Sequence, residues 1–223
     1  MAYAGLDTYG CPSDEITAWW LANTNLRWLG YYLGGPSSRD TSWLSKRAAK
    51  VAQGWGLMPV FEGQQVSGPG SKIVTAAQGV IDGADAVRLM QSEGFASCSK
   101  VALDLETPDT WEVWGPYVTS FFYAVAKGSY TPAVYFGHGM GAGLVEGLAA
   151  AGIPNPPLWP FRVTQAVAGP MAAPYSEDDP AALSGVPGAS ICQCARGATI
   201  SDGQGGTVLV DLNTATTPDP CAP

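Results

Sequence analysis

The stretch KVALDLE, residues 100–106, indicates most directly how this chain folds. Its apolar residues are typical of a buried strand, and two carboxylates, Asp104 and Glu106, stand at its end. Side chains two residues apart on a strand lie on the same face, so both carboxylates share the face of Ala102. The intervening Val and Leu residues face the other way, where helices can cover them. We therefore expect two acids to project together from the end of a buried strand.

Seven further stretches of this kind alternate with segments that have helical spacing. They are residues 4–9, 26–34, 57–63, 132–137, 158–166, 190–194 and 207–213. Strand–helix alternation along a whole chain is typical of an α/β protein with a parallel sheet, and eight strands are the number that closes a barrel. We expect one compact (β/α)8 barrel of the TIM type over residues 1–223.

The later part of the chain has less room for helices. Residues 168–186 are rich in Pro and Gly and only 179–183 looks helical, while residues 196–206 are too short and glycine-rich for a helix. The late helices of the barrel should therefore be reduced.

An open, doubly wound sheet is the alternative, and it predicts a glycine-rich phosphate loop after the first strand. Here GCPSDE, residues 10–15, follows that strand. Four alternating glycines follow the fifth strand instead, without a Lys or an acidic ribose partner. They are Gly137, Gly139, Gly141 and Gly143. The sequence therefore favours the barrel.

Composition and charge narrow the class of ligand. The 223 residues are 46% hydrophobic and 13% charged, which excludes a disordered chain, and no apolar run reaches the roughly 18 residues of a membrane span. The start MAYAGLDTYG lacks the basic and apolar regions of a signal peptide, so we expect a leader to be absent from this chain. A net charge of −8 repels nucleic acid and anionic lipid but is compatible with sugars or amines.

Active sites of such barrels lie at the carboxyl ends of the strands, and polar side chains end nearly every expected strand here. They are Asp7, Glu62, Asp104, Glu106, Tyr135, His138, Gln165, Gln193 and Asp211. The first and last strands are neighbours in a closed barrel, so Asp7 and Asp211 should lie close together. Aromatic residues near the expected rim could stack on sugar rings. They are Tyr31, Tyr32, Trp111, Trp114, Tyr135 and Trp159.

Converging carboxylates repel one another, which raises the pKa of one or more of them. A protonated carboxyl beside an ionised one is what glycosidic cleavage requires. Carboxylates can also hold Mg²⁺, Ca²⁺ or Mn²⁺, which leaves a metal-dependent phosphoesterase as an alternative. The single His138 disfavours zinc, and no GxSxG motif indicates a serine nucleophile. We expect no cofactor and no metal.

The chain has five cysteines and no CxxC motif. Most should be small buried side chains, and a disulfide involving Cys11 or Cys221 stays open.

Several motifs, in this order, resemble a known family. GLDTYG (5–10), VALDLE (101–106), ICQCA (191–195) and VLVDLN (208–213) resemble the family-25 glycoside hydrolases, which are lysozymes with a (β/α) barrel. YYLGGP (31–36), GLMPVFEGQ (56–64) and VYFGHG (134–139) are similar to the related glycoside-hydrolase-like domain of actinobacteria and their phages, domain-of-unknown-function family 1906. The resemblance covers nearly the whole chain, from Gly5 to Asn213.

The resemblance implies a role for each acid. Glu106 matches the general acid, Asp104 the aspartate that supports the transition state or the N-acetyl group, and Asp7 and Asp211 the aspartates that orient substrate. Gln193 stands where family-25 members have a Gln-Tyr pair, but Cys194 follows it here. The substrate-binding residues we expect are Tyr32, Glu62, Trp111, Tyr135, His138, Gln165 and Gln193.

The resemblance also implies a monomer that acts on peptidoglycan or another bacterial cell-envelope glycan, outside the cell or in its envelope, or as a phage lysis or virion protein. A glycan-binding or envelope-associated barrel without turnover is the alternative from another class. Whether cleavage is retaining or inverting depends on the carboxylate separation, about 5–5.5 Å for retention and about 6.5–9.5 Å for inversion. Substrate-assisted cleavage through an N-acetyl group would not follow this rule.

Overall fold

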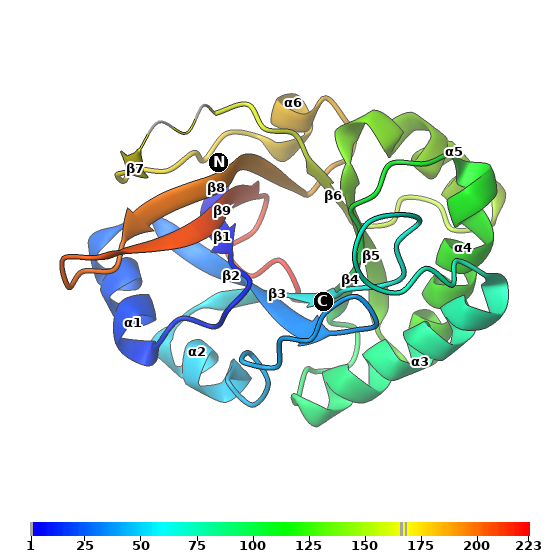
Figure 1. Ribbon diagram of the computed structural model, residues 1–223, viewed down its shortest axis with the longest axis horizontal. Coiled ribbons are helices and arrows are strands. Elements are labelled where there is room, and N and C mark those ends of the chain that lie inside the picture. The colour runs from blue at the N-terminus through cyan, green and yellow to red at the C-terminus, as the bar shows by residue number, and fades with distance from the viewer. Residues whose placement is uncertain (1, 166, 168) are drawn as a thin grey trace.

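Eight strands close into a barrel in the computed structural model, which describes residues 2–165, 167 and 169–223 (Figure 1). Around the barrel the order is β6-β5-β4-β3-β2-β1-β9-β8, and pairing of β6 with β8 closes the circle. The barrel strands are β1 (Tyr3–Asp7), β2 (Leu26–Gly34), β3 (Gly56–Phe61), β4 (Lys100–Leu105), β5 (Thr131–Gly137), β6 (Leu158–Phe161), β8 (Ile191–Ser201) and β9 (Thr207–Ala215). The expected single-domain barrel is confirmed.

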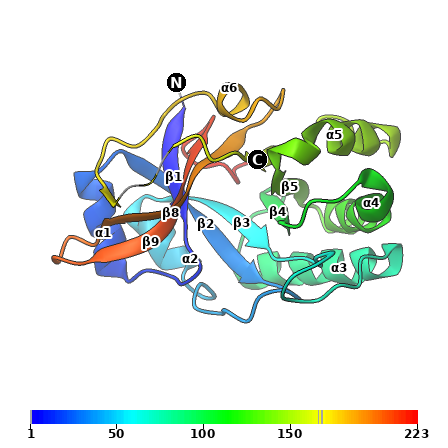
Figure 2. The ribbon, with the colours of Figure 1, turned by 45° about the horizontal axis from the view of Figure 1, so that its top comes forward.

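Strands β1 to β6 run parallel, as expected, but β9 runs antiparallel to both of its neighbours, β1 and β8. The expectation of a parallel last strand is therefore wrong. Residues 196–201 extend β8, which leaves only residues 202–206 to join it to β9. A parallel crossover needs about a dozen residues or more, whereas a connection this short forms a hairpin. The hairpin projects past the barrel beside α1 (Figures 1 and 2).

The helices divide into two groups on the outside of the barrel (Figure 1). α1 (Asp14–Asn23) and α2 (Arg47–Gln53) lie on one side, and α3 (Ala76–Ser92), α4 (Trp111–Lys127) and α5 (Gly141–Ala150) on the other. A 3₁₀ turn, η1 (His138–Met140), precedes α5. In the part of the chain that the structure describes, no helix combines the length and apolar character needed to cross a membrane.

The late elements are short, as expected. α6 (Pro180–Ser184) has five residues and β7 (Pro170–Met171) two. β6 ends at Phe161, earlier than the expected strand over 158–166, because residues 162–165 leave the regular ladder. Ala166 and Ala168, at the ends of two expected segments, lie outside the described residues. None of the five cysteines, all of them described, forms a disulfide; Cys192, Cys194 and Cys221 are buried.

Aromatic side chains fill the barrel beneath its mouth. Trp28 from β2 and Trp159 from β6 meet edge to face, with ring centroids 5.6 Å apart. The indole of Trp159 donates to the Oδ1 of Asn213 at 3.0 Å. Gly30 is required next to this layer, because a Cβ there would come within 2.6 Å of the Cβ of Asp7. The core therefore leaves room for Asp7 at the top of the barrel.

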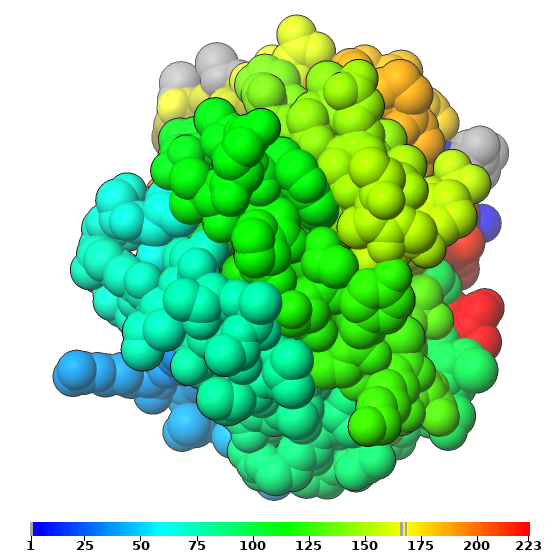
Figure 3. Space-filling view, turned by 90° about the vertical axis from the view of Figure 1, so that its right-hand side faces the viewer, coloured from blue at the N-terminus to red at the C-terminus, as the bar shows by residue number. Residues whose placement is uncertain are grey.

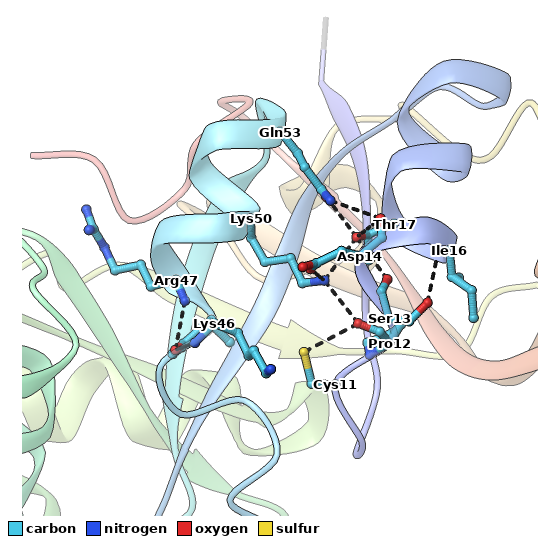
Figure 4. A network of polar contacts seen from close by, with 11 residues as sticks. Cys11, Pro12, Ser13, Asp14, Ile16, Thr17, Lys46, Arg47, Lys50 and Gln53 are labelled. Carbon is cyan, nitrogen blue, oxygen red and sulfur yellow. Dashed lines mark hydrogen bonds and ion pairs between the residues drawn. The ribbon is translucent and has the colours of Figure 1, made fainter.

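A buried lysine fixes the segment that follows Asp7 (Figure 4). Lys50 of α2 has a fully buried side chain, and its three Nζ protons have three acceptors. These are the carbonyl of Pro12 at 3.0 Å, Asp14 Oδ1 at 2.8 Å and Thr17 Oγ1 at 3.0 Å. An ammonium removed from water must be paired in this way. Lys50 thus ties the β1–α1 loop and the start of α1 to α2.

We predict that Asp14→Asn lowers the free energy of unfolding by about 1–2 kcal/mol, because it removes the counter-charge of the buried Lys50 ammonium while the Asp14 side chain, 54% exposed, is partly screened by solvent. Urea unfolding of the purified protein measures this. Asp85→Asn is the matched control, since its partner Arg88 is 66% exposed and such a pair contributes less than about 1 kcal/mol. Equal losses in the two variants would contradict the role given to Lys50.

Candidate active site

An acid-lined pocket of about 340 Å³ opens at the carboxyl ends of β1 to β4, and a smaller hollow continues it into the barrel. Five side chains line both parts: Asp7, Tyr32, Asp104, Glu106 and Asp211. Glu62, directly after β3, lines the outer part, and Tyr135 of β5 lines the inner part. We call the two together the acid pocket. The expected convergence of the acids at one mouth of the barrel is found.

Strand pairing brings the first two acids together. Asp7 is the last residue of β1, and in the ladder it lies directly opposite Asp211 of β9. Asp211 was expected at the end of a parallel strand, but it stands in the middle of β9, because that strand runs the other way and continues past the rim. Residues that face each other across antiparallel strands have Cα atoms about 4.5–5.5 Å apart.

The second pair of acids comes from β4. Asp104 lies in the strand, and Glu106 follows one residue after its end, so the two line the same pocket as their spacing predicts. Gln65 holds this strand end in place. Its Nε2 donates to the Asp104 carbonyl at 3.1 Å, and its Oε1 accepts from the Glu106 backbone N–H at 3.1 Å. No pattern in the sequence singles out Gln65.

Hydrogen bonds fix the carboxylates of Asp7 and Asp211. Asp7 accepts from the Tyr32 hydroxyl and from Asn213 Nδ2, each at 2.7 Å. Asp211 accepts from Gln193 Nε2 and from the Gly197 N–H, each at 2.6 Å. Gln193 is buried and lies outside the pocket lining, so it positions Asp211.

The Oε1 of Gln193 in turn accepts from the Tyr135 hydroxyl. A chain of hydrogen bonds thus runs from Tyr135 of β5 through Gln193 of β8 to Asp211 of β9. It orients one acid through side chains from two other strands of the barrel.

The four acids differ in exposure. Asp7 and Asp104 are each only 6% exposed, Asp211 is half-buried, and Glu106 is exposed. Asp104 Oδ1 is buried and has no hydrogen-bond partner among the described residues. Glu106 therefore meets solvent at the mouth of the pocket, while Asp104 lies beneath it.

The pKa values follow this burial. Burial, followed by the charges of Glu106, Glu62 and Asp7, raises the pKa of Asp104 well above its ordinary value. Burial and then the charge of Asp211 raise the pKa of Asp7 to about 7, against the opposing effect of its hydrogen bonds to Tyr32 and Asn213. Burial also raises the pKa of Glu62 and of Asp211. The site therefore holds protonated and ionised carboxyls together near neutral pH.

Three residues expected at the site lie elsewhere. His138 is exposed at the start of η1, where its Nδ1 lies 3.2 Å from the Phe161 carbonyl. Gln165 stands four residues after β6, and its backbone N–H donates to the Cys194 carbonyl. Trp111 lines a separate pocket between α4 and α5. Gln165 was expected at the site because the sequence placed the end of its strand too late. His138 and Trp111 lie away from the acid pocket although the strands before them end as expected.

Two exposed wall residues were not expected. Tyr9 and Leu209 line the acid pocket and are each 63% exposed. Thr8 links their segments, because its hydroxyl donates to the Leu209 carbonyl at 2.9 Å. Tyr9 stands two residues after Asp7, so alternation could have indicated it. Leu209 reaches the pocket only because β9 passes the rim, which the sequence did not indicate.

The arrangement of the acids suits proton transfer better than metal binding. Within the described residues, no group of three or more His, Cys, Asp or Glu side chains has the geometry to hold a metal ion. The oxygens of Asp7 and Asp211 are already engaged by amide and hydroxyl donors, which a cation would have to displace.

Comparison with known proteins finds a matching family model. Residues 17–215 match the family model described as Rv2525c-like, glycoside hydrolase-like domain. No curated protein matches the chain.

Among solved structures, the Tat-secreted protein Rv2525c of Mycobacterium tuberculosis, in complex with HEPES, has 13% identity and a TM-score of 0.65 over 98% of each chain. The spore cortex lytic enzyme SleM of Clostridium perfringens has 16% identity and a TM-score of 0.64, over 96% of this chain and 67% of SleM. A bacterial lysozyme from Streptomyces coelicolor has 13% identity and a TM-score of 0.60, over 97% of this chain and 93% of the lysozyme. At these identities the likeness shows a shared fold.

We predict that the free energy of unfolding falls as pH rises from about 4 to 7. The pKa of Asp7 is 3.8 in its ordinary state and about 7 here, so between these values the folded protein binds more protons than the unfolded chain. This contribution is complete below pH about 4 and is lost as pH passes the folded-state value. Urea unfolding at a series of pH values measures the slope.

Asp7→Asn should flatten that slope, since it removes the titrating group, while Asp85→Asn on the exposed face of α3 should leave it unchanged. A slope of the opposite sign, or one that Asp7→Asn leaves intact, would contradict the protonation of Asp7.

Proposed function

This chain belongs to the Rv2525c-like, glycoside hydrolase-like family, and we propose that it hydrolyses peptidoglycan or a related glycan of the bacterial cell envelope. The observation that carries the proposal is the acid pocket, in which Asp7, Asp104, Glu106 and Asp211 converge at the mouth of the barrel. Such a cluster raises the energy of the empty protein, and it is useful where a glycosidic bond must receive a proton.

Glu106 is the proton donor in this proposal. It is the exposed member of the acid cluster, so it can reach the oxygen of a glycosidic bond that lies across the pocket. A sugar seated over it would bring the glycosidic oxygen within reach of this carboxyl, as general acid catalysis requires.

Asp104 lies beneath Glu106 and acts on the sugar from the floor of the acid pocket. Its buried Oδ1 has no hydrogen-bond partner among the described residues, so this carboxyl lacks the donors that hold Asp7 and Asp211. When ionised, Asp104 stabilises the positive charge that develops at the anomeric carbon, and when protonated it can donate to an N-acetyl oxygen. Asp7 and Asp211 are held rigidly by their hydrogen bonds and orient the sugar hydroxyls.

Tyr32, Tyr135 and Glu62 complete the substrate contacts in the pocket. Peptidoglycan is the favoured substrate because structures of similar fold include a bacterial lysozyme and a spore cortex lytic enzyme. Rv2525c is described as Tat-secreted, which supports action outside the cell or in its envelope.

The test is release of reducing sugar from purified peptidoglycan. We predict that Glu106→Gln lowers the rate by at least about 100-fold, because a positioned general acid contributes that much. Glu146→Gln, an exposed acid on α5 outside the acid pocket, is the matched control and should keep the wild-type rate.

Each other outcome rejects a part of the proposal. Wild-type protein that binds peptidoglycan without releasing sugar would instead be a binding module. A Glu106→Gln variant as active as the wild type would remove Glu106 as proton donor. Activity lost in a chelator and restored by Mg²⁺ or Mn²⁺ would favour metal-dependent chemistry.

A further inference from the structure

A second pocket, of about 310 Å³, lies between the start of α4 and the start of α5, and we call it the α4–α5 pocket. Its volume is at the lower end of the range for small-molecule sites, roughly 300–1,000 Å³. α4 follows the β4 loop that begins at Glu106, and α5 follows β5, so both walls start at the carboxyl ends of barrel strands. The pocket is therefore at the same end of the barrel as the acids. Figure 3 faces the side on which these helices lie next to each other.

The alternating glycines after β5 divide into two pairs. Packing explains one pair: a Cβ at Gly137 would lie 3.2 Å from Phe161, and one at Gly141 would lie 2.9 Å from Val186.

Nothing in the fold requires the other pair. A Cβ at Gly139 or Gly143 would meet no atom within 4 Å, and neither residue has a positive φ. Glycine inside a helix is nonetheless about 0.5–1 kcal/mol less favourable than alanine. Both of these glycines line the α4–α5 pocket. Their missing side chains keep the pocket open.

One wall of the pocket is a rigid aromatic. Trp111 packs against glycines of both helices, since a Cβ would come within 2.7 Å of its indole at Gly115 and within 2.1 Å at Gly147. Met140 and Leu144 add apolar surface. Trp114 also lines the pocket; its side chain is fully buried, and its indole N–H has no acceptor among the described residues. The indole of Trp111 is therefore the aromatic surface that the pocket offers to a ligand.

The charges of the pocket select the class of ligand. Asp109 and Glu112 are exposed carboxylates in its lining, and the lining contains no Lys, Arg or His. Phosphate and other anions would be repelled. Hydroxyl groups can donate to the carboxylates, and a ring face can lie on Trp111. A pyranose unit offers both features.

We propose that the α4–α5 pocket is an accessory subsite that binds one neutral pyranose unit of a glycan. The choice of a saccharide as ligand rests on the proposed function, whereas the pocket itself does not. The segment 106–110 joins it directly to the acid pocket, so a glycan chain can occupy both.

The probe is chitotetraose, the tetramer of N-acetylglucosamine, titrated into the Glu106→Gln protein so that no turnover occurs. In ¹H–¹⁵N spectra we expect shifts of the indole N–H signals of Trp111 and Trp114 and of the amide signals of Gly139 and Gly143. Shifts confined to residues of the acid pocket, or no binding of the tetramer, would overturn the subsite.

Two further variants in the same background separate binding from folding. We predict that Gly143→Leu fills the pocket and weakens tetramer binding at least about tenfold, a change of 1.4 kcal/mol, without lowering the melting temperature. Ala149→Leu, an exposed alanine of α5 outside the pocket, is the matched control and should bind as the parent does.

Equal affinity of the parent and Gly143→Leu would overturn the subsite. Failure of the proposed function is a separate result, because wild-type protein would then release no sugar from peptidoglycan whatever Gly143→Leu does to binding.

Discussion

The antiparallel pairing of β1 with β9 is the constraint on which the rest of the structure depends. It joins the first strand of the barrel to the last and, in the same ladder, places Asp7 opposite Asp211. A one-residue slip in this pairing would turn Asp211 to the other face of its strand. Because the pairing also aligns Asn213 with Gly5, the Asn213 side chain can bridge the indole of Trp159 below and the Asp7 carboxylate above. Core packing and site geometry therefore share one register.

The acid pocket lowers the stability of the folded protein, because it gathers acids away from water. Asp7 and Asp104 lie almost fully buried near other acids, and the Asp104 carboxyl has an oxygen without a partner. A protein selected only for stability would replace such a residue with an apolar one. The Trp28–Trp159 layer and the hydrogen bonds of Gln65 to the end of β4 keep these acids in place. Buried acids of this kind, supported by a regular scaffold, are expected at functional sites.

Much of this site could be predicted because strand alternation is a local rule. KVALDLE alone places Asp104 and Glu106 on one face, and adjacency of the first and last strands places Asp7 near Asp211. The direction of β9 could not be predicted in the same way, because it depended on where β8 ends, and residues 196–201 look like a loop by composition. Leu209 lines the pocket because β9 continues past the rim, and Gln165 lies outside it because β6 ends early. Both positions depend on where a strand ends. Gln65 acts through two backbone contacts that leave no pattern in sequence.

The two pockets at this end of the barrel can have different roles, one in the reaction and one in binding the glycan. The acid pocket gathers the carboxylates that can orient a sugar and transfer a proton to it, and Tyr9 and Leu209 form its exposed wall. The α4–α5 pocket has the opposite character, with a rigid indole and open glycines but no buried carboxylate. Binding energy gained away from the scissile bond can hold a substrate against the repulsion of the acids and so favour the reacting geometry. Glu106 stands at the start of the segment between the pockets, where a chain bound in both would have to pass.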